Sequence, residues 1–244
     1  MLKAILTGHS RGLGAAICNE LLGRGIPVLG IARSPLADVP RQGDKLEQVG
    51  LDLSDPAAVA AWLGSDELPR RLAGCTRILL INNAGLVEPV GPLGVQDPSA
   101  VARAVSVNVA APLMLADAVC AYANASKAGE VRVLHVSSGA GRSAYPGWSV
   151  YCATKAALDH HARAAALDGV STLRICSLAP GVIDTDMQAA IRATPLERFP
   201  LRERFEGMKR DGALSSPGEC ADRLVGFLLS EGFGKEPVAD LRAL

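Results

Sequence analysis

Short apolar runs alternate along the chain with longer stretches of helical periodicity. Six runs are predicted to be strands covered on both faces, because they are apolar at consecutive positions: residues 3–7, 27–31, 46–50, 78–82, 131–137 and 172–177. Four stretches have helical spacing, the last two being long and rich in alanine: residues 12–25, 56–63, 99–125 and 149–167. This alternation predicts an α/β fold, a doubly wound parallel sheet with helices on both faces. Ligands of such sheets bind beyond the carboxyl ends of the strands, so we expect the chemistry there.

The whole chain, residues 1–244, is predicted to form one domain without internal repeats or linkers. The segment 194–217 differs in composition, since it carries three prolines and a mixed charge pattern. It also interrupts the alternation of strands and helices. One interpretation is a lid over the substrate, extending over residues 186–217. The other is an ordinary surface excursion of helices and turns.

Charge and hydropathy exclude several kinds of partner. The 25 basic and 25 acidic residues balance, which argues against binding nucleic acid or an anionic membrane surface. Every apolar run appears shorter than the roughly 18 residues of a spanning helix. The opening apolar stretch is interrupted at Gly8, so we expect no secretory leader and a cytoplasmic location. Six scattered cysteines, without CxxC pairs or nearby histidines, predict reduced thiols and no metal site.

A glycine-rich turn follows the first predicted strand. The sequence from Thr7 to Gly14, TGHSRGLG, places three glycines where a strand passes into a helix. Glycines let the backbone approach a pyrophosphate, and the helix N-terminus favours its negative charge. The turn therefore predicts nucleotide binding, although such turns also occur for packing alone. The residues assigned to this site are Gly8, Ser10, Arg11, Gly12, Leu13 and Gly14.

The end of the second predicted strand indicates which nucleotide binds. An acidic residue there would accept from the ribose 2′-OH, but the sequence has Ala32, Arg33 and Ser34. Arg33 and Arg11 together suit a 2′-phosphate, because guanidinium groups bind phosphate through several charge-assisted hydrogen bonds. The alternative is that either arginine is a solvated surface charge. We expect NADP(H), with Arg33 and Ser34 at its 2′-phosphate.

Two further strand ends fit the same cofactor. An Asp52 carboxylate is placed to accept from the adenine amino group, and Leu53 follows it. The backbone of Asn83, Ala84 and Gly85 is expected to pass beside the adenine and its ribose. Either motif alone would more often be a turn.

A candidate catalytic constellation consists of Asn108, Ser138, Tyr151 and Lys155. Tyr151 and Lys155 are one helical turn apart, so both project from one face. A tyrosine has an unperturbed pKa of about 10, and a nearby ammonium lowers it. Ser138, after the fifth strand, is expected to donate to a substrate carbonyl while Tyr151 delivers the proton. Asn108 is expected to hold a water that reaches Lys155.

The ordered set of motifs resembles the short-chain dehydrogenase/reductase family over essentially the whole chain. The matching residues are the glycine turn, Asp52, Asn82 to Gly85, Asn108, Ser138, Tyr151 to Lys155, Pro180 and Gly181. The resemblance implies a single Rossmann-like domain with about seven parallel strands. It also implies an Asn-Ser-Tyr-Lys tetrad, and both Tyr151 and Lys155 in contact with the cofactor, Lys155 at the nicotinamide ribose. The stretch Pro180, Gly181, Val182 and Thr185 would meet the nicotinamide end.

The run from Pro180 to Gln188, PGVIDTDMQ, resembles the sepiapterin reductase and benzil reductase branch of that family. Asp240 falls where that branch places an aspartate that anchors a pterin. A terminal strand with a solvent-facing carboxylate would explain Asp240 equally well. The early end of the chain also leaves the two long helices as the expected interface of a homodimer.

Aromatic and apolar residues flank the predicted tyrosine and are substrate-facing candidates. With Ser138 and Asp240, they are Gly139, Tyr145, Trp148, Met187 and Phe205. In a chain with only 4% aromatic residues, Tyr145 and Trp148 so close together suit a flat or apolar ketone. Packing against the neighbouring loop is the alternative.

The sequence is compatible with three candidate functions. The first is an NADPH-dependent reductase of a small ketone, a vicinal dicarbonyl or an aromatic ketone. The second is an oxidoreductase of acyl, sugar or steroid substrates, which the same scaffold allows. The third is a nucleotide-sensing protein that has lost turnover, which the presence of all four catalytic side chains disfavours.

Overall fold

The computed structural model describes residues 1–37 and 45–244. Seven parallel strands form one sheet in the order β3-β2-β1-β4-β5-β6-β7. They are β1 (Leu2–Thr7), β2 (Val28–Ala32), β3 (Leu46–Gly50), β4 (Arg77–Asn82), β5 (Glu130–Val136), β6 (Leu173–Ala179) and β7 (Val238–Asp240). The chain order reverses between β1 and β4, which is where a doubly wound sheet opens a crevice for ligands. The predicted single-domain Rossmann-like fold is confirmed.

Each of the six strands predicted from apolar runs is present, with ends that shift by no more than a few residues. The central strands are buried along nearly their whole length, as expected between two helical layers. β3 differs, because Glu47, Gln48 and Gly50 are exposed at the edge of the sheet. The prediction that this run is covered on both faces was therefore wrong.

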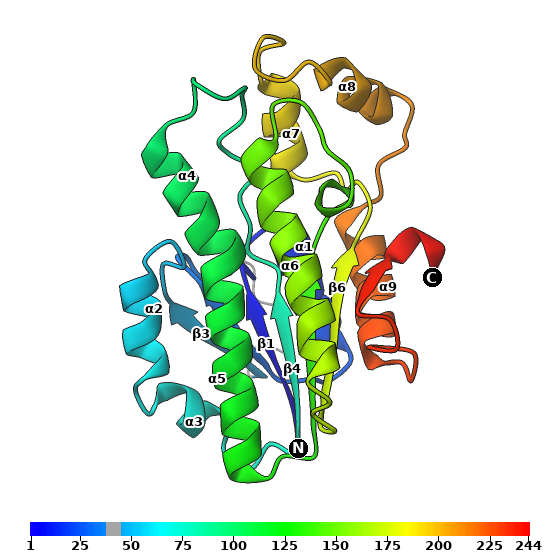
Figure 1. Ribbon diagram of the computed structural model, residues 1–244. Coiled ribbons are helices and arrows are strands. Elements are labelled where there is room, and N and C mark those ends of the chain that lie inside the picture. The colour runs from blue at the N-terminus through cyan, green and yellow to red at the C-terminus, as the bar shows by residue number, and fades with distance from the viewer. Residues whose placement is uncertain (38–44) are drawn as a thin grey trace.

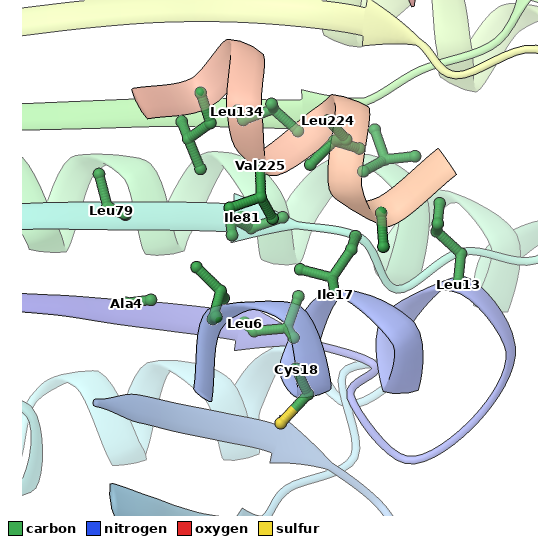
Figure 2. Packing of buried hydrophobic residues seen from close by; sticks show 14 of the residues in the cluster. Ala4, Leu6, Leu13, Ile17, Cys18, Leu79, Ile81, Leu134, Leu224 and Val225 are labelled. Atoms are coloured by element: carbon green, nitrogen blue, oxygen red, sulfur yellow. The ribbon is translucent and has the colours of Figure 1, made fainter. Parts of the chain in front are cut away.

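One face of the sheet is covered by α1 (Gly12–Gly23) and α9 (Pro217–Leu229). Figure 2 shows their apolar side chains, including Ile17 and Leu224, packed over β1, β4 and β5. The α9 helix was not predicted, although the sequence at its start is typical of a helix N-terminus. Ser216 and Glu219 form a reciprocal capping box around Pro217 at the first turn.

The other face is covered by α2 (Pro56–Leu63), α3 (Glu67–Leu72), α4 (Pro98–Val105), α5 (Ala111–Ser126) and α6 (Ser149–Leu167). The predicted helix 99–125 is one helical run from α4 through α5. A π-helical turn, η2 (Ser106–Ala110), interrupts it and contains Asn108. Such turns insert one residue into the hydrogen-bond ladder and are frequent at functional sites.

The run Pro98–Ser126 is long and apolar enough to cross a membrane, with a mean hydropathy of 1.7 in its most apolar window. The expectation that no stretch reaches that length was wrong for this run. Its buried residues, among them Ala111, Leu115 and Val119, pack against the sheet. Core helices of globular proteins have the same composition.

Two helices lie beyond the carboxyl ends of the strands, α7 (Asp186–Ala193) and α8 (Arg202–Arg210) (Figure 1). Both belong to the segment 186–217, for which an excursion of helices and turns was one of the two interpretations. A parallel bridge between Ile183 and Ser215 joins the two ends of this segment. Two short 3-10 turns, η3 (Gly139–Gly141) and η4 (Leu241–Ala243), complete the edge where the candidate site lies.

Candidate active site

The glycine turn runs from the end of β1 to the start of α1. Gly8 and Gly12 have φ angles of 68° and 54°, in the left-handed region that favours glycine. Gly14 has a different reason to be glycine, because a Cβ there would lie 1.9 Å from the Gly8 carbonyl oxygen. The three glycines thus fold the turn tightly onto itself, and no side chain caps the start of α1.

Thr7 and Asn83 join the ends of β1 and β4 beneath this turn. The Thr7 Oγ1 accepts from the backbone amides of Asn83 and Ala84, both at 3.0 Å. The Asn83 Nδ2 donates to the carbonyls of Thr7 at 3.0 Å and Gly8 at 3.2 Å. Thr7 was not among the predicted site residues, although it stands first in the glycine motif.

Thr185 lies over the start of α1 from the opposite side. A Cβ on Gly12 would be 3.5 Å from the Thr185 Cγ2, so the two segments are in near contact. Pro180, Gly181 and Val182 precede it, half-buried at the end of β6. A dinucleotide fits these residues, since the cradle is narrow, lined by glycine backbone and open at a helix N-terminus. Leu13, by contrast, is buried in the core and contributes packing.

The two predicted phosphate arginines are both exposed at this edge, Arg11 at the start of α1 and Arg33 after β2. The neighbouring Ser34 is exposed as well. The Asp52 carboxylate accepts from the Ser54 amide at 2.9 Å and hydroxyl at 2.8 Å. Those two bonds lower the pKa of Asp52, and the charge of Arg33 lowers it further.

His9 is a buried member of the glycine turn that sequence reasoning missed. Its Nε2 is 2.8 Å from the Gln48 Oε1 on β3, and its ring covers Gly30, where a Cβ would lie 2.6 Å away. The same Gln48 oxygen accepts from the Leu36 amide at 2.7 Å. Gln48 therefore connects the turn that carries Arg11 to the segment that follows Arg33.

Tyr151 and Lys155 lie on α6 and are both buried, with exposed fractions of 8% and 4%. Burial raises the pKa of Tyr151 to about 12, although the Ser138 side chain acts in the other direction. The net shift is opposite to the lowering expected from Lys155, because burial disfavours the charged phenolate. The phenol is consequently protonated at neutral pH, which is the form a proton donor needs.

Lys155 Nζ donates to the Val136 carbonyl at 2.8 Å and lies 5.7 Å from the centre of the Tyr151 ring. Burial lowers the pKa of this ammonium to about 8, and Asp159 one turn later opposes the shift. A Cβ on Gly85 would be 3.5 Å from both Lys155 Nζ and Asn108 Oδ1. Lys155, Gly85 and Asn108 therefore surround one small space.

Asn108 is fixed by the backbone opposite it. Its Oδ1 accepts from the Leu86 amide and its Nδ2 donates to the Leu86 carbonyl, both at 2.8 Å. Nδ2 also lies 3.1 Å from Thr154 Oγ1 on α6. The side chain thus ties η2 to the loop after β4 and to the helix of Tyr151.

Ser138 follows β5 and begins the η3 turn. Its Oγ accepts from the Ala140 amide at 3.2 Å. The hydroxyl hydrogen remains available to donate. The Ser138 side chain is near enough to Tyr151 to lower the pKa of the phenol by hydrogen bonding. The structure brings the four predicted tetrad residues together at one end of the sheet.

An aromatic cluster packs against Tyr151. The Trp148 ring is 5.4 Å from the Tyr151 ring and stacks on Phe199 at 4.6 Å. Phe205 of α8 lies 5.4 Å from Trp148, and Tyr145 lies 5.5 Å from it. Met187 of α7 packs against the same cluster. The segment 186–217 therefore contacts the site through buried side chains.

The Asp240 carboxylate is not free, because it forms an ion pair with Arg242. It accepts from the Arg242 amide at 3.0 Å and from the Nε and Nη2 at 2.9 and 2.6 Å. These bonds lower the pKa of Asp240. The stem of Arg242 packs on Gly181, with its Cγ and Cδ 3.6 Å from where a Cβ would be. Tyr145 approaches Gly139 from the same side. The pair therefore stands at the edge of the candidate site.

A cavity of about 540 Å³ lies between the loop after β4 and α7. Its lining includes Val87, Glu88, Ile191 and Arg198. Val87 and Ile191 also belong to the aromatic cluster's core, so the cavity adjoins the tetrad from the far side of that cluster. Within residues 1–37 and 45–244, no group of three or more His, Cys, Asp or Glu side chains is placed to hold a metal.

Comparison with known proteins decides the family. The short chain dehydrogenase model matches residues 3–196. The chain belongs to the short chain dehydrogenase family. It is 32% identical over 240 residues to "Benzil reductase ((S)-benzoin forming)" of Bacillus cereus, covering 96% of each chain. It is 35% identical over 243 residues to sepiapterin reductase of Mus musculus, covering 94% of this chain and 92% of that one.

Among solved structures, this short chain dehydrogenase is similar to a short-chain dehydrogenase/reductase from Burkholderia vietnamiensis. The two are 50% identical with a TM-score of 0.72, covering 100% of this chain and 98% of the other. The resemblance to the sepiapterin and benzil reductase branch is confirmed. The chain is an oxidoreductase of the family, whose relatives indicate carbonyl reduction.

Proposed function

We propose that this protein is an NADPH-dependent carbonyl reductase of small ketones or vicinal dicarbonyls, with Tyr151 as the general acid. One observation carries the proposal: the buried Tyr151 lies beside the Ser138 side chain, with the Lys155 Nζ 5.7 Å from the centre of its ring. The similarity to benzil and sepiapterin reductases supports the substrate class. A single domain with the segment 186–217 as a substrate cover completes the proposal.

The residues act on the carbonyl oxygen. Ser138 donates its hydroxyl hydrogen to that oxygen and holds it toward Tyr151. As negative charge develops on the oxygen, Tyr151 transfers its proton to it, leaving a phenolate beside Lys155. The Lys155 ammonium stabilises that phenolate by its charge. A reduced nicotinamide bound at the cradle supplies the hydride.

The cofactor preference rests on two exposed cations. Arg11 and Arg33 lie on the two segments that would flank an adenosine 2′-phosphate, and Ser34 is adjacent. Gly8, Ser10, Gly12 and Gly14 would hold the pyrophosphate, with Thr185 closing over it. Asn83, Ala84 and Gly85, together with Asp52 and Leu53, would border the adenine and its ribose. Val182 and Lys155 would hold the nicotinamide end.

A homodimer in the cytoplasm is the proposed state of the protein. In the run Pro98–Ser126, Val105 is an exposed apolar side chain, and Leu113 and Met114 are only half-buried. A second copy of the same helices, with α6 beside them, would cover that surface symmetrically. Light scattering behind a sizing column tests the mass, and a monomer at micromolar concentration would contradict this assembly.

The function is tested by mixing the purified protein with NADPH and each member of a panel of carbonyl compounds. The oxidation of NADPH is monitored by its absorbance. The panel contains benzil, phenylpropanedione, sepiapterin, an acetoacetyl thioester and a keto sugar, and is repeated with NADH. Turnover of the diketones or sepiapterin with NADPH is expected. Preference for the thioester or the sugar would contradict the substrate class. Tight NADPH binding without any turnover would contradict the role of Tyr151.

A further inference from the structure

Asp159 is a buried carboxylate that the mechanism above does not use. It lies on α6, one helical turn after Lys155, and is 1% exposed. Its Oδ1 accepts from two serine hydroxyls, Ser137 at the end of β5 and Ser177 in β6, both at 2.7 Å. A buried charge is costly unless it is paired and hydrogen-bonded, so this carboxylate needs partners that explain its position.

Two of those partners belong to the turn that carries Ser138. Arg142 Nε lies 3.6 Å from the Asp159 Oδ2. Between them, Gly141 packs directly on α6, because a Cβ there would be 3.0 Å from both Asp159 Oδ2 and the Lys155 carbonyl. Ser137 is the residue immediately before Ser138. The carboxylate therefore holds the segment on both sides of the candidate hydrogen-bond donor.

Lys155 lies one helical turn before Asp159, on the same face of α6. Burial lowers the pKa of this ammonium to about 8, and the negative charge of Asp159 raises it. His135 of β5 also faces Lys155, but burial lowers its pKa to about 3, so it is neutral near pH 8. Tyr151 is protonated in the same range. The charge of Asp159 therefore opposes the effect of burial on Lys155, and Arg142 lies beside that carboxylate.

We propose that Asp159 is a positioning residue of the reductase: it keeps the Lys155 ammonium charged and holds the turn from Ser137 to Arg142 against α6. The inference rests on the proposed function, because it assigns Asp159 a task in the same site. It makes the charge balance between Asp159 and Arg142 a determinant of the alkaline limit of activity.

Three variants separate charge from packing. Asp159→Asn keeps an oxygen that accepts from both serines but removes the charge, so Lys155 should lose its proton at lower pH. Arg142→Gln removes the cation that faces the carboxylate, so Lys155 should lose its proton at higher pH. Ser177→Ala removes one hydrogen bond and leaves every charge in place. It is the matched control for packing.

Two measurements are made on each full-length variant. The first is the pH dependence of the rate of NADPH oxidation with benzil. The second is a carbon-13 titration of labelled lysine side chains, with the Lys155 resonance assigned by comparison with Lys155→Arg. The second measurement does not depend on turnover, so it tests the role of Asp159 even where the proposed substrate class fails.

For Asp159→Asn we expect both the Lys155 titration and the alkaline limb to move down by about one pH unit. For Arg142→Gln we expect a smaller shift upward. For Ser177→Ala we expect a lower melting temperature with neither midpoint moved. A uniform loss of rate across all pH values in Asp159→Asn, with the Lys155 titration unchanged, would overturn the proposal. Equal shifts in Ser177→Ala would overturn it as well.

Discussion

Asn108 bonds both polar groups of the Leu86 backbone, with its Nδ2 and Oδ1 each 2.8 Å from the carbonyl and the amide. This pair fixes the loop after β4 to a helical run at its π-turn. Asn108→Leu should leave the Leu86 groups unsatisfied and lower the free energy of unfolding by about 2 kcal/mol. Urea denaturation measures the loss. Asn124→Leu, at an exposed position of the same helical run, should leave stability nearly unchanged, and an equal loss there would contradict the interpretation.

Removing the proton donor should separate chemistry from binding. Tyr151→Phe is expected to reduce turnover by at least about a thousandfold, because proton transfer to the developing alkoxide is lost. NADPH affinity, measured by the fluorescence of the bound cofactor, should change little. The control is Tyr122→Phe, which removes a hydroxyl bonded to the Leu72 carbonyl at 2.8 Å away from the site. That variant should retain full turnover. Comparable loss of binding and turnover in Tyr151→Phe would refute the assigned role.

The cofactor preference should depend on Arg33. Arg33→Ala removes a cation from the segment after β2, so the ratio of NADH to NADPH dissociation constants should fall about tenfold or more. Titration calorimetry with both cofactors gives the ratio. Arg163→Ala, another exposed arginine on α6, serves as the control. An unchanged ratio in Arg33→Ala would assign the 2′-phosphate to Arg11 alone.

The contact between His9 and Gly30 leads to a prediction on packing. A Cβ at position 30 would lie 2.6 Å from the His9 ring. Gly30→Ala should displace that ring, weaken its bond to Gln48, and lower both stability, by about 1–3 kcal/mol, and NADPH affinity. Gly23→Ala, where nothing lies within 4 Å, should instead be neutral or stabilising. Wild-type NADPH affinity in Gly30→Ala would show that the His9 contact does not shape the cofactor turn.

Lys155 should leave a signature in the pH dependence of stability. Its pKa is lowered from 10.5 to about 8, so between these values the unfolded chain binds more protons at this group than the folded chain. The contribution of Lys155 to the free energy of unfolding therefore rises with pH across that window, by about 3 kcal/mol. The stability difference between the wild type and Lys155→Met, measured from pH 7 to about 10.5, tests this. A flat difference would contradict the lowered pKa.

The sheet and the glycine turn could be predicted because they depend on local patterns. Apolar runs and TGHSRGLG identify β1, β4 and the start of α1 without knowledge of any contact. The ends of the strands then place Ser138 and Tyr151 at one edge by topology alone. For the same reason, η2 at Asn108 escaped prediction, since a π-turn leaves no distinct pattern of apolar positions.

Features that depend on distant contacts could not be predicted in this way. The pairing of His9 with Gln48 joins residues far apart in the sequence and rests on Gly30 beneath the ring. The raised pKa of Tyr151 depends on how completely Trp148 and its neighbours bury the phenol. The i, i+4 spacing of Tyr151 and Lys155 predicts that they are close together. It does not predict how far burial changes their pKa values. The partner of Asp240 depends on the turn at η4.

The bridge between Ile183 and Ser215 has a consequence for how substrate range changes among related enzymes. Ser215 donates to the Val182 carbonyl, and the Asp184 amide donates to the Ser215 carbonyl, both at 3.0 Å. The chain thus leaves the sheet scaffold at Ile183 and returns to it beside the same residue at Ser215. The residues between these two positions form an insert whose two ends are adjacent. Its length can change without altering strand register, but Phe199 and Phe205 within it pack on Trp148, which in turn packs on Tyr151. Sequence change confined to this insert can therefore alter what packs against Tyr151 while the seven-stranded scaffold stays the same.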